Sequence, residues 1–193
     1  ATWTDVDHSS CGGNQQRWSK RIQFSYTFMP LLGRIVVAGG RGNSTPWYKD
    51  VWYSNIDAEC WTLATGDIDP LTSGFVGAKL LAVPFGGVEA LLLLGGYRFA
   101  TLGGATNAVR LSIDGGSIWT IVASAGANMW AKRSGFAAVV DARIARLLIW
   151  GGSSSSASQH KADLWTAPLH PVYTALAPYR PPLSFVDAYC GIR

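Results

Sequence analysis

Charged side chains, and glutamate above all, are scarce in this sequence. Only 15% of the 193 residues are charged, whereas 48% are hydrophobic, and the only glutamates are Glu59 and Glu89. So apolar a composition excludes a disordered segment, because the chain can bury enough surface to fold. The net charge of +4 includes no run of Lys or Arg, so we expect no nucleic-acid partner.

Long apolar runs are also missing. Stretches such as 90–94 and 147–150 stop at glycine pairs, far short of the roughly 18 residues of a membrane-spanning helix, so we expect no direct membrane insertion. No secretory leader is visible. Because the sequence opens at Ala1 without an initiator methionine, we expect a processed form or an excerpt of a longer chain.

Potential metal ligands are few and poorly spaced. The cysteines are Cys11, Cys60 and Cys190, and the histidines are His8, His160 and His170. No C-x-x-C pair occurs, and each histidine stands beside Ser, Lys or Pro, as solvated loop histidines do. We therefore expect no metal and at most one internal disulfide, and the cysteines leave the redox compartment open.

A repeat of about 56 residues organises the chain. An apolar run ending in a glycine pair occurs three times, 56 residues apart, at Gly39-Gly40, Gly95-Gly96 and Gly151-Gly152. An aromatic residue before Thr recurs at intervals of 58, 58 and 54, at Trp3, Trp61, Trp119 and Tyr173. A third landmark, Trp18-x-Lys20-Arg21-x-x-Phe24, returns two periods later as Trp130-x-Lys132-Arg133-x-x-Phe136. Three landmarks thus indicate one period.

Each period predicts four short strands and no helix. The expected strands are 23–28, 34–38, 50–54 and 60–64; then 75–83, 89–94, 107–112 and 118–123; then 135–140, 146–150, 162–167 and a weaker 172–176. Four strands per repeat are typical of a propeller blade. The predicted fold is therefore all-β, a single partial propeller over 1–193. It comprises an outer strand of a preceding blade at 1–4, blades at 17–64, 74–123 and 135–176, and a tail at 177–193.

Two motifs resemble known families. The segment AGGRGNSTPWYKDVWYSNIDAECWTLA resembles a kelch repeat, with its apolar strand, Gly-Gly, long loop, Asp-Val-aromatic strand and Trp. In the middle repeat, SIDGGSIW resembles the Asp-box hairpin of sialidase-like propellers through Ser112, Asp114, Gly116 and Trp119. Residues Ser54, Asp57 and Trp61 look like a degenerate relative. The resemblance implies a kelch-type β-propeller.

These motif residues are predicted to be structural. The glycine pairs allow positive φ and close backbone approach, immediately after the second strand of each blade. Asp114 is expected to accept hydrogen bonds from the amides of its own hairpin, and Trp61 and Trp119 to be buried at equivalent sites. Such motifs identify a fold rather than an activity.

Catalysis is not expected from these residues. Glycoside hydrolysis needs a pair of carboxylates, or a Tyr with a Glu and an arginine cluster. Glu59 and Glu89 are predicted at a hairpin and at a strand start, away from a central channel, and Arg21 and Arg133 are expected to pair with nearby acids. Copper radical oxidases, which share the kelch fold, need two His, two Tyr and a Cys that this sequence does not bring together. We expect no catalytic residue and no cofactor.

The loops 41–49, 97–106 and 153–161 are expected on one rim, where they would suit recognition. The candidate binding residues are Arg41, Trp47, Tyr48, Tyr97, Arg98, Phe99, His160 and Lys161, types common in binding hot spots. Alternatively, Trp47 and Tyr48 fold back over the blade or pack on a neighbouring subunit. Asn43 begins a glycosylation sequon, which slightly favours an extracellular or secretory location. Arg110 is expected at an edge or interface with its stem packed.

The predicted function is a non-catalytic protein-binding or structural scaffold, with a protein or neighbouring subunits as the expected partner and a glycan as a further candidate. The alternative is a carbohydrate-binding or carbohydrate-active, sialidase-like propeller whose catalytic residues lie outside this segment. Propellers close with about four to eight blades. Three blades must therefore belong to a longer propeller, which we favour, or pair with a second copy, or lie against other subunits of a large assembly.

Overall fold

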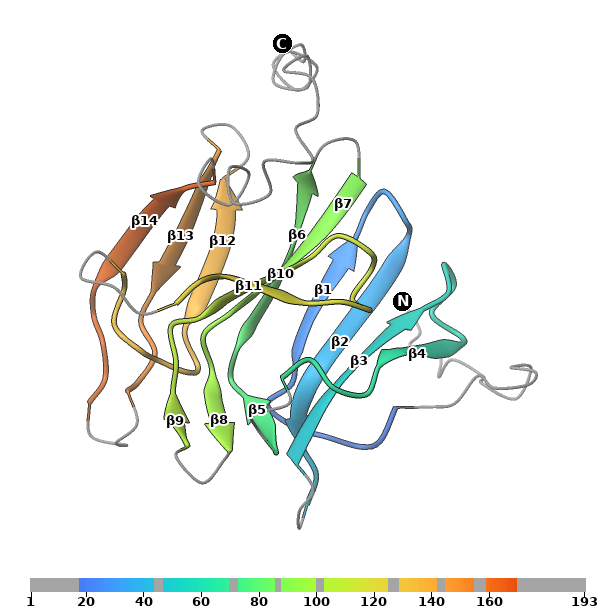
Figure 1. Cartoon of the computed structure of the whole chain (residues 1–193), viewed down its shortest axis with the longest axis horizontal. Coiled ribbons are helices and arrows are strands. Elements are labelled where there is room, and N and C mark those ends of the chain that lie inside the picture. Colours follow the sequence, from blue (N-terminus) through green and yellow to red (C-terminus); the bar gives the residue numbers. More distant parts are fainter. Residues whose placement is uncertain are drawn as a thin grey trace, which may run out of the picture.

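A computed structural model describes residues 18–43, 47–69, 73–85, 88–99, 103–124, 129–141, 145–154 and 159–169. These residues form fourteen strands in four antiparallel sheets and contain no helix (Figure 1). The all-β prediction is confirmed. The described residues form an open row of sheets and not a closed ring.

Three larger sheets follow one another along the chain. Sheet 1 contains β1 (Ser25–Met29), β2 (Arg34–Arg41), β3 (Trp47–Ser54) and β4 (Trp61–Thr65), in that order. Sheet 2 contains β6 (Lys79–Phe85), β7 (Val88–Leu94), β10 (Val109–Ser112) and β11 (Thr120–Ala123), again in chain order across the sheet. Sheet 3 contains β12 (Ala137–Asp141), β13 (Arg146–Trp150) and β14 (Leu164–Pro168). In each of these sheets the strands lie side by side in chain order, and the first of them (β1, β6 or β12) is called the inner strand below.

A fourth, small sheet was not predicted. It contains β5 (Gly74–Val76), β8 (Tyr97–Phe99) and β9 (Gly104–Ala105), in the order β5-β8-β9. The expected single strand 75–83 breaks at Gly77, whose φ is +63°, into β5 and β6. The expected irregular loop 97–106 is also wrong, because the chain beyond Gly96 pairs with β5 and then turns back as β9. Strands 1–4 and 172–176 and the tail lie outside the described residues.

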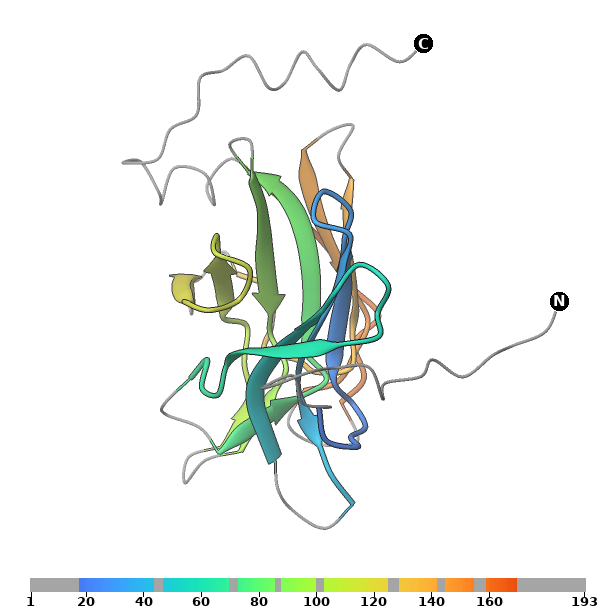
Figure 2. The same ribbon diagram turned by 90° about the vertical axis from the view of Figure 1, so that its right-hand side faces the viewer.

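The inner strands join the three sheets. β6 lies between β1 and β12 (Figures 1 and 2). The Gly77 amide donates to the Gln23 carbonyl at 3.0 Å, and the Gly135 amide donates to the Gly77 carbonyl at 2.8 Å. All three residues have positive φ, from 56° to 63°. The same backbone position thus recurs at intervals of 54 and 58 residues, and each copy bonds to the next.

The core fills the two spaces between the larger sheets. In β7, Leu91 and Leu93 pack toward sheet 1, whereas Leu92 and Leu94 pack toward sheet 3. A strand covered on both faces has no polar alternation, which explains the continuous apolar run 90–94. Below, the face of a sheet that points toward the next sheet along the chain is called its following face, and the opposite face is called its preceding face. In sheet 3, the preceding face packs on sheet 2, and the following face is the opposite one.

Candidate functional site

The glycine pairs occupy equivalent places, as predicted. Each stands at the end of the second strand of its sheet, within β2 in sheet 1 and directly after β7 and β13 in sheets 2 and 3. All six glycines have positive φ, from 53° to 100°. An added Cβ at Gly39 would lie 2.5 Å from the Phe75 ring, and one at Gly95 would lie 2.6 Å from Trp130. In sheets 1 and 2, the bare backbone therefore receives an aromatic ring of the next repeat.

A buried arginine fastens the strands of sheet 1 beside its glycine pair. The Arg21 guanidinium donates to both carboxylate oxygens of Asp50, at 2.5 and 3.0 Å, and to the Gly39 carbonyl at 2.9 Å. The Trp52 indole donates to the same carboxylate at 2.7 Å. These contacts of Arg21, Asp50 and Trp52 are called the clasp below. The Arg21 side chain is fully buried, so the clasp holds strands together and does not expose the guanidinium to a ligand.

Sheet 3 repeats this clasp atom for atom. Arg133 donates to Asp163 at 2.6 and 2.7 Å and to the Gly151 carbonyl at 2.8 Å, and the Trp165 indole donates to Asp163 at 2.7 Å. The hydrogen bond from Arg133 holds the pKa of Asp163 well below its usual range, against the opposing effect of desolvation. The expectation that Arg21 and Arg133 pair with nearby acids is confirmed.

Sheet 2 lacks the clasp, and it lacks both charges together. Counting from the aligned positions Gly77 and Gly135, Phe75 stands where Arg133 does. Ala108 stands where Asp163 does, because its carbonyl accepts the amide of Gly95 as that of Asp163 accepts the amide of Gly151. An apolar pair thus replaces the ion pair, and no charge is left buried without a partner at these positions.

The hairpin between β10 and β11 has the predicted hydrogen bonds. Asp114 accepts from the Ser117 amide at 3.0 Å and from the Ile118 amide at 3.0 and 3.1 Å, and Ser112 donates to it at 2.7 Å. The Trp119 indole donates to the Gly116 carbonyl at 2.8 Å. One expectation needs correction: Trp61 is buried on β4, but Trp119 immediately precedes β11 and is only half-buried, because its indole turns back onto the hairpin.

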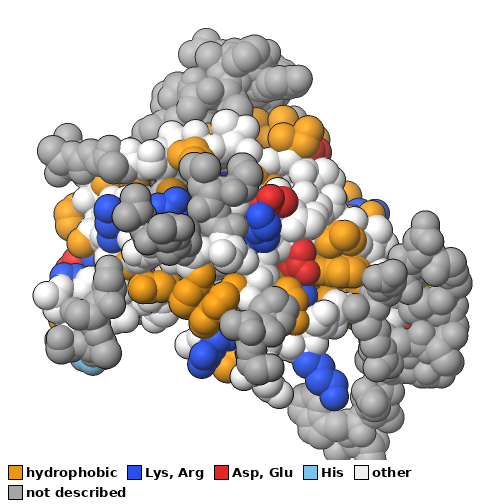
Figure 3. Space-filling view, turned by 60° about the horizontal axis from the view of Figure 1, so that its bottom comes forward, with side chains coloured by type: hydrophobic (Ala, Val, Ile, Leu, Met, Phe, Trp, Pro, Cys, Tyr) orange, Lys and Arg blue, Asp and Glu red, His pale blue; other side chains and the backbone are white. Residues whose placement is uncertain are grey.

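Four of the predicted rim residues form an aromatic cluster between sheet 1 and the small sheet: Arg41, Trp47, Tyr97 and Phe99. The rings of Trp47 and Phe99 stack with centroids 3.3 Å apart, and Tyr97 lies 4.9 Å from Phe99. The Arg41 guanidinium lies 5.7 Å from the Trp47 ring, and its buried Nε has no hydrogen-bond partner in the described structure. All four are half-buried. This end of the molecule faces the viewer in Figure 3, with apolar and charged side chains side by side.

Tyr48, also a rim candidate, folds back over sheet 1, because its ring lies 3.9 Å from the buried Arg21 guanidinium. Trp47 likewise contacts its own chain. At Gly74, an added Cβ would lie 2.6 Å from the carbonyl carbon and the Cβ of Trp47, so a glycine is needed where β5 approaches the backbone of β3. Tyr48 thus folds back over its own sheet, whereas the Trp47 ring stacks on Phe99 of the small sheet, and both side chains are half-buried.

Beside the aromatic cluster, two arginines share one carboxylate. Arg110 pairs with Asp69, which lies in the connection between β4 and β5, and Arg98 lies 3.7 Å from the same carboxylate. Burial lowers the pKa of the Arg110 guanidinium, and the charge of Asp69 opposes this shift. The expected edge position of Arg110 is wrong, because β10 lies between β7 and β11. No sequence signal identifies Asp69, 41 residues away.

The remaining candidates lie elsewhere. In the described chain, no ring contact or side-chain hydrogen bond connects His160 or Lys161 with the aromatic cluster. The backbone of His160 forms an isolated β-bridge with Ser153. Lys161 borders the following face of sheet 3. Asn43 is exposed just after β2. Glu89 accepts a hydrogen bond from the Leu31 amide at 3.1 Å, and burial raises the pKa of its carboxyl. It connects sheets 1 and 2 and does not face a site.

The ranges that the structure describes contain no cluster of three or more His, Cys, Asp or Glu side chains, and no helix that could cross a bilayer. Cys60 is disulfide-bonded. No protein-family model matches the sequence, and no curated protein matches it either.

Proposed function

We propose that this chain is an arc of a kelch-like propeller and acts as a non-catalytic scaffold that binds a protein partner or neighbouring subunits. The observation that supports this most is the Arg-Asp-Trp clasp, which recurs in sheets 1 and 3 with the same partners. Its arginines, aspartates and glycines serve the packing of one repeat, as residues of repeat proteins do.

The aromatic cluster and Arg98 are the proposed binding surface. Stacking fixes Trp47 and Phe99 before a partner arrives, which lowers the entropy cost of binding. The Arg98 side chain keeps 35% of its surface exposed beside Asp69, and the half-buried Arg41 lies beside the Trp47 ring. Aromatic and arginine side chains of this kind dominate protein-binding hot spots.

A photo-crosslinking amino acid placed at Tyr97 in the native host tests this surface. We expect one discrete adduct that is lost with Arg98→Ala, and no adduct from the same probe at Ile118, an exposed residue of the β10-β11 hairpin. Identical patterns from both positions, or an adduct insensitive to Arg98→Ala, would argue against the rim.

The second candidate is a carbohydrate-binding or carbohydrate-active propeller whose catalytic residues lie outside this segment. The hydrogen bonds of Asp114 favour it, because they fit the resemblance of SIDGGSIW to the Asp-box hairpins of sialidase-like propellers. A glycan array probed with the isolated chain separates the two candidates. The scaffold predicts that no glycan is retained, whereas selective retention of a glycan would favour the carbohydrate-binding candidate.

We also propose an extracellular or secretory location. The Cys60 disulfide fits an oxidising compartment, and Asn43 is exposed in its sequon. Treatment of the native protein with an N-glycosidase should lower its apparent mass, and Asn43→Gln should remove that change. Native protein insensitive to the glycosidase would leave Asn43 without a role.

A further inference from the structure

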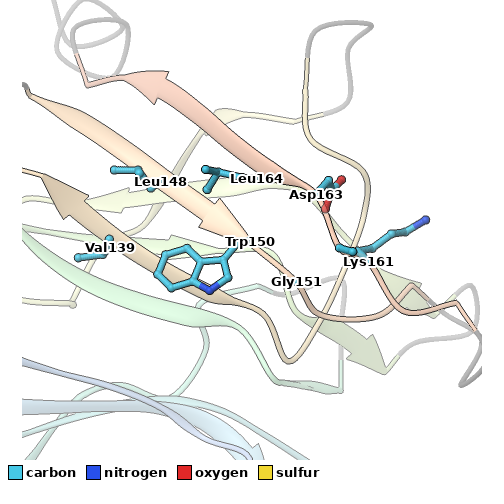
Figure 4. A pocket seen from close by; sticks show the side chains of 8 residues that line it. Val139, Leu148, Trp150, Gly151, Lys161, Asp163 and Leu164 are labelled. Atoms are coloured by element: carbon cyan, nitrogen blue, oxygen red, sulfur yellow. The ribbon is translucent and has the colours of Figure 1, made fainter.

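The following face of sheet 3 is apolar and uncovered in the described structure. Val139, Leu148, Trp150 and Leu164 border a hollow of about 620 Å³ that also reaches Gly151 (Figure 4). Trp150 is 42% exposed and Leu164 is 65% exposed. Monomeric proteins rarely leave such side chains together in water, so this face calls for a covering surface.

The repeat shows what kind of surface covers it. Leu148, Trp150 and Leu164 correspond to Val36, Ala38 and Val51 in sheet 1 and to Leu92, Leu94 and Val109 in sheet 2, as the strand registers show. The six residues of sheets 1 and 2 are at most 5% exposed. In those sheets the preceding face of another sheet covers these positions. Sheet 3 therefore presents the same half of an interface without its other half.

Gly151 shows the same vacancy at one backbone position. Rings of the next repeat fill the space above Gly39 and Gly95, but above Gly151 the nearest atom is the Lys161 carbonyl oxygen, 3.9 Å from the position of an added Cβ. The φ of Gly151, +68°, is close to that of Gly39 and Gly95. The glycine is thus in the conformation that receives a ring, with no ring present.

The preceding face of sheet 1 carries the missing half. Trp130 and Phe136, which fill the space above Gly95, have centroids 5.1 Å apart at an interplanar angle of 55°. Trp18 and Phe24 of sheet 1 have centroids 5.2 Å apart at 59°. Arg21 lies 5.6 Å from the Trp18 ring, and Arg133 lies 5.8 Å from the Trp130 ring.

These docking residues are less covered in sheet 1 than in sheet 3. Trp18 and Phe24 are half-buried, whereas Trp130 and Phe136 are 6% and 2% exposed. Tyr26 and Phe28, which the register places on the same face, are 67% and 56% exposed. Sheet 1 thus offers, uncovered, the arrangement with which sheet 3 docks on sheet 2.

We infer that the following face of sheet 3 binds the preceding face of sheet 1 in a second copy of this chain, with Trp18 of that copy seated over Gly151. The inference rests on the proposed propeller scaffold and names its partner. Each copy offers both halves of the interface, so two copies close head to tail through two equal contacts. Two copies of the three larger sheets that the structure describes give six, within the about four to eight blades that propellers use.

The test is the mass of the purified chain, measured by sedimentation at micromolar concentration. We expect twice the 20.7 kDa of one chain. Leu164→Asp on the following face, or Tyr26→Asp on the preceding face, should weaken dimerisation by roughly 100-fold, because each buries an unpaired carboxylate in an apolar contact. Both residues are mostly exposed within one chain, so both variants should fold. Ile118→Asp, in the β10-β11 hairpin at a residue that is 71% exposed, is the matched control and should remain a dimer.

Mixing the two variants decides the geometry. In a head-to-tail dimer, Leu164→Asp mixed with Tyr26→Asp leaves one interface free of both substitutions, so the mixture should dimerise although neither variant does alone. A wild-type chain that stays monomeric, a mixture that does not dimerise, or a filament in place of a dimer would overturn the inference. Arg98→Ala should leave the dimer intact. A monomer that retains the rim adduct would therefore refute this inference alone, and a dimer without the adduct would refute the binding rim alone.

Discussion

The clasp of sheet 3 permits a sharp test of how this fold handles buried charge. Arg133 has no exposed side-chain surface, and its terminal nitrogens hold the Asp163 carboxylate at 2.6 and 2.7 Å. An arginine stays charged in proteins, so Asp163→Ala would leave a buried cation without its partner. Removing one member of a buried pair costs about 3 to 5 kcal/mol.

The exposure of each aspartate side chain determines whether the loss of stability lies near the lower or the upper end of about 3 to 5 kcal/mol. The Asp163 side chain is 38% exposed, so water can enter the vacated place and hydrate part of the guanidinium. We expect Asp163→Ala to lower the free energy of unfolding by about 3 kcal/mol. The Asp50 side chain is only 16% exposed, so Asp50→Ala should cost more, about 4 kcal/mol.

The second sheet supplies the compensating change, because it holds Phe75 and Ala108 at the two positions. The double variant Arg133→Phe with Asp163→Ala buries no charge and should lose about 1 kcal/mol, less than Asp163→Ala alone. Urea unfolding followed by tryptophan fluorescence measures the wild type, Asp50→Ala, Asp163→Ala, Arg133→Phe and the double variant at one concentration, since association would shift apparent stability. A double variant as unstable as the sum of its single variants would refute the idea that the two charges are kept as a pair.

Three further outcomes follow from single contacts. Asp114→Ala should cost about 1 to 2 kcal/mol through lost hairpin hydrogen bonds, and Asp114→Asn, which keeps one acceptor oxygen, should cost less; equal losses would contradict the hydrogen-bond explanation. Burial raises the pKa of Glu89, so the folded state retains its proton to higher pH than the unfolded state, and stability should fall as pH rises through that window. Glu89→Gln should reduce the change of unfolding free energy with pH, measured from pH 4 to 8. An unchanged pH dependence would show that Glu89 is not its cause. Gly95→Ala should cost several kcal/mol because its methyl group meets Trp130 at 2.6 Å, whereas Gly151→Ala, at a similar positive φ in open space, should cost about 1 kcal/mol in a monomeric background; equal costs would contradict the packing argument.

The sequence by itself determined the all-β fold, the repeat and most strand positions. Glycine pairs and aromatic residues recur at a fixed period because each repeat packs the same way on the next, so every copy needs bare backbone at one place and a ring at another. The pairing of Arg21 and Arg133 with acids was also readable, since a buried guanidinium requires a carboxylate. The Asp114 hairpin is local, because each of its side-chain hydrogen bonds joins residues at most four positions apart.

Only the tertiary structure decided how distant segments meet. Asp69 reaches Arg110 from another repeat, and no local pattern encodes an ion pair across 41 residues. The small sheet forms because the chain beyond Gly96 finds β5, a strand that propensity alone merges with β6. Four of the eight rim candidates form the aromatic cluster because the small sheet carries Tyr97 and Phe99 toward Trp47, whereas His160 and Lys161 lie elsewhere. The tertiary structure also decided which of three equivalent positions are buried. Ala38 and Leu94 are covered by the next sheet, whereas Trp150, at the same place in the repeat, is exposed because no described sheet follows sheet 3.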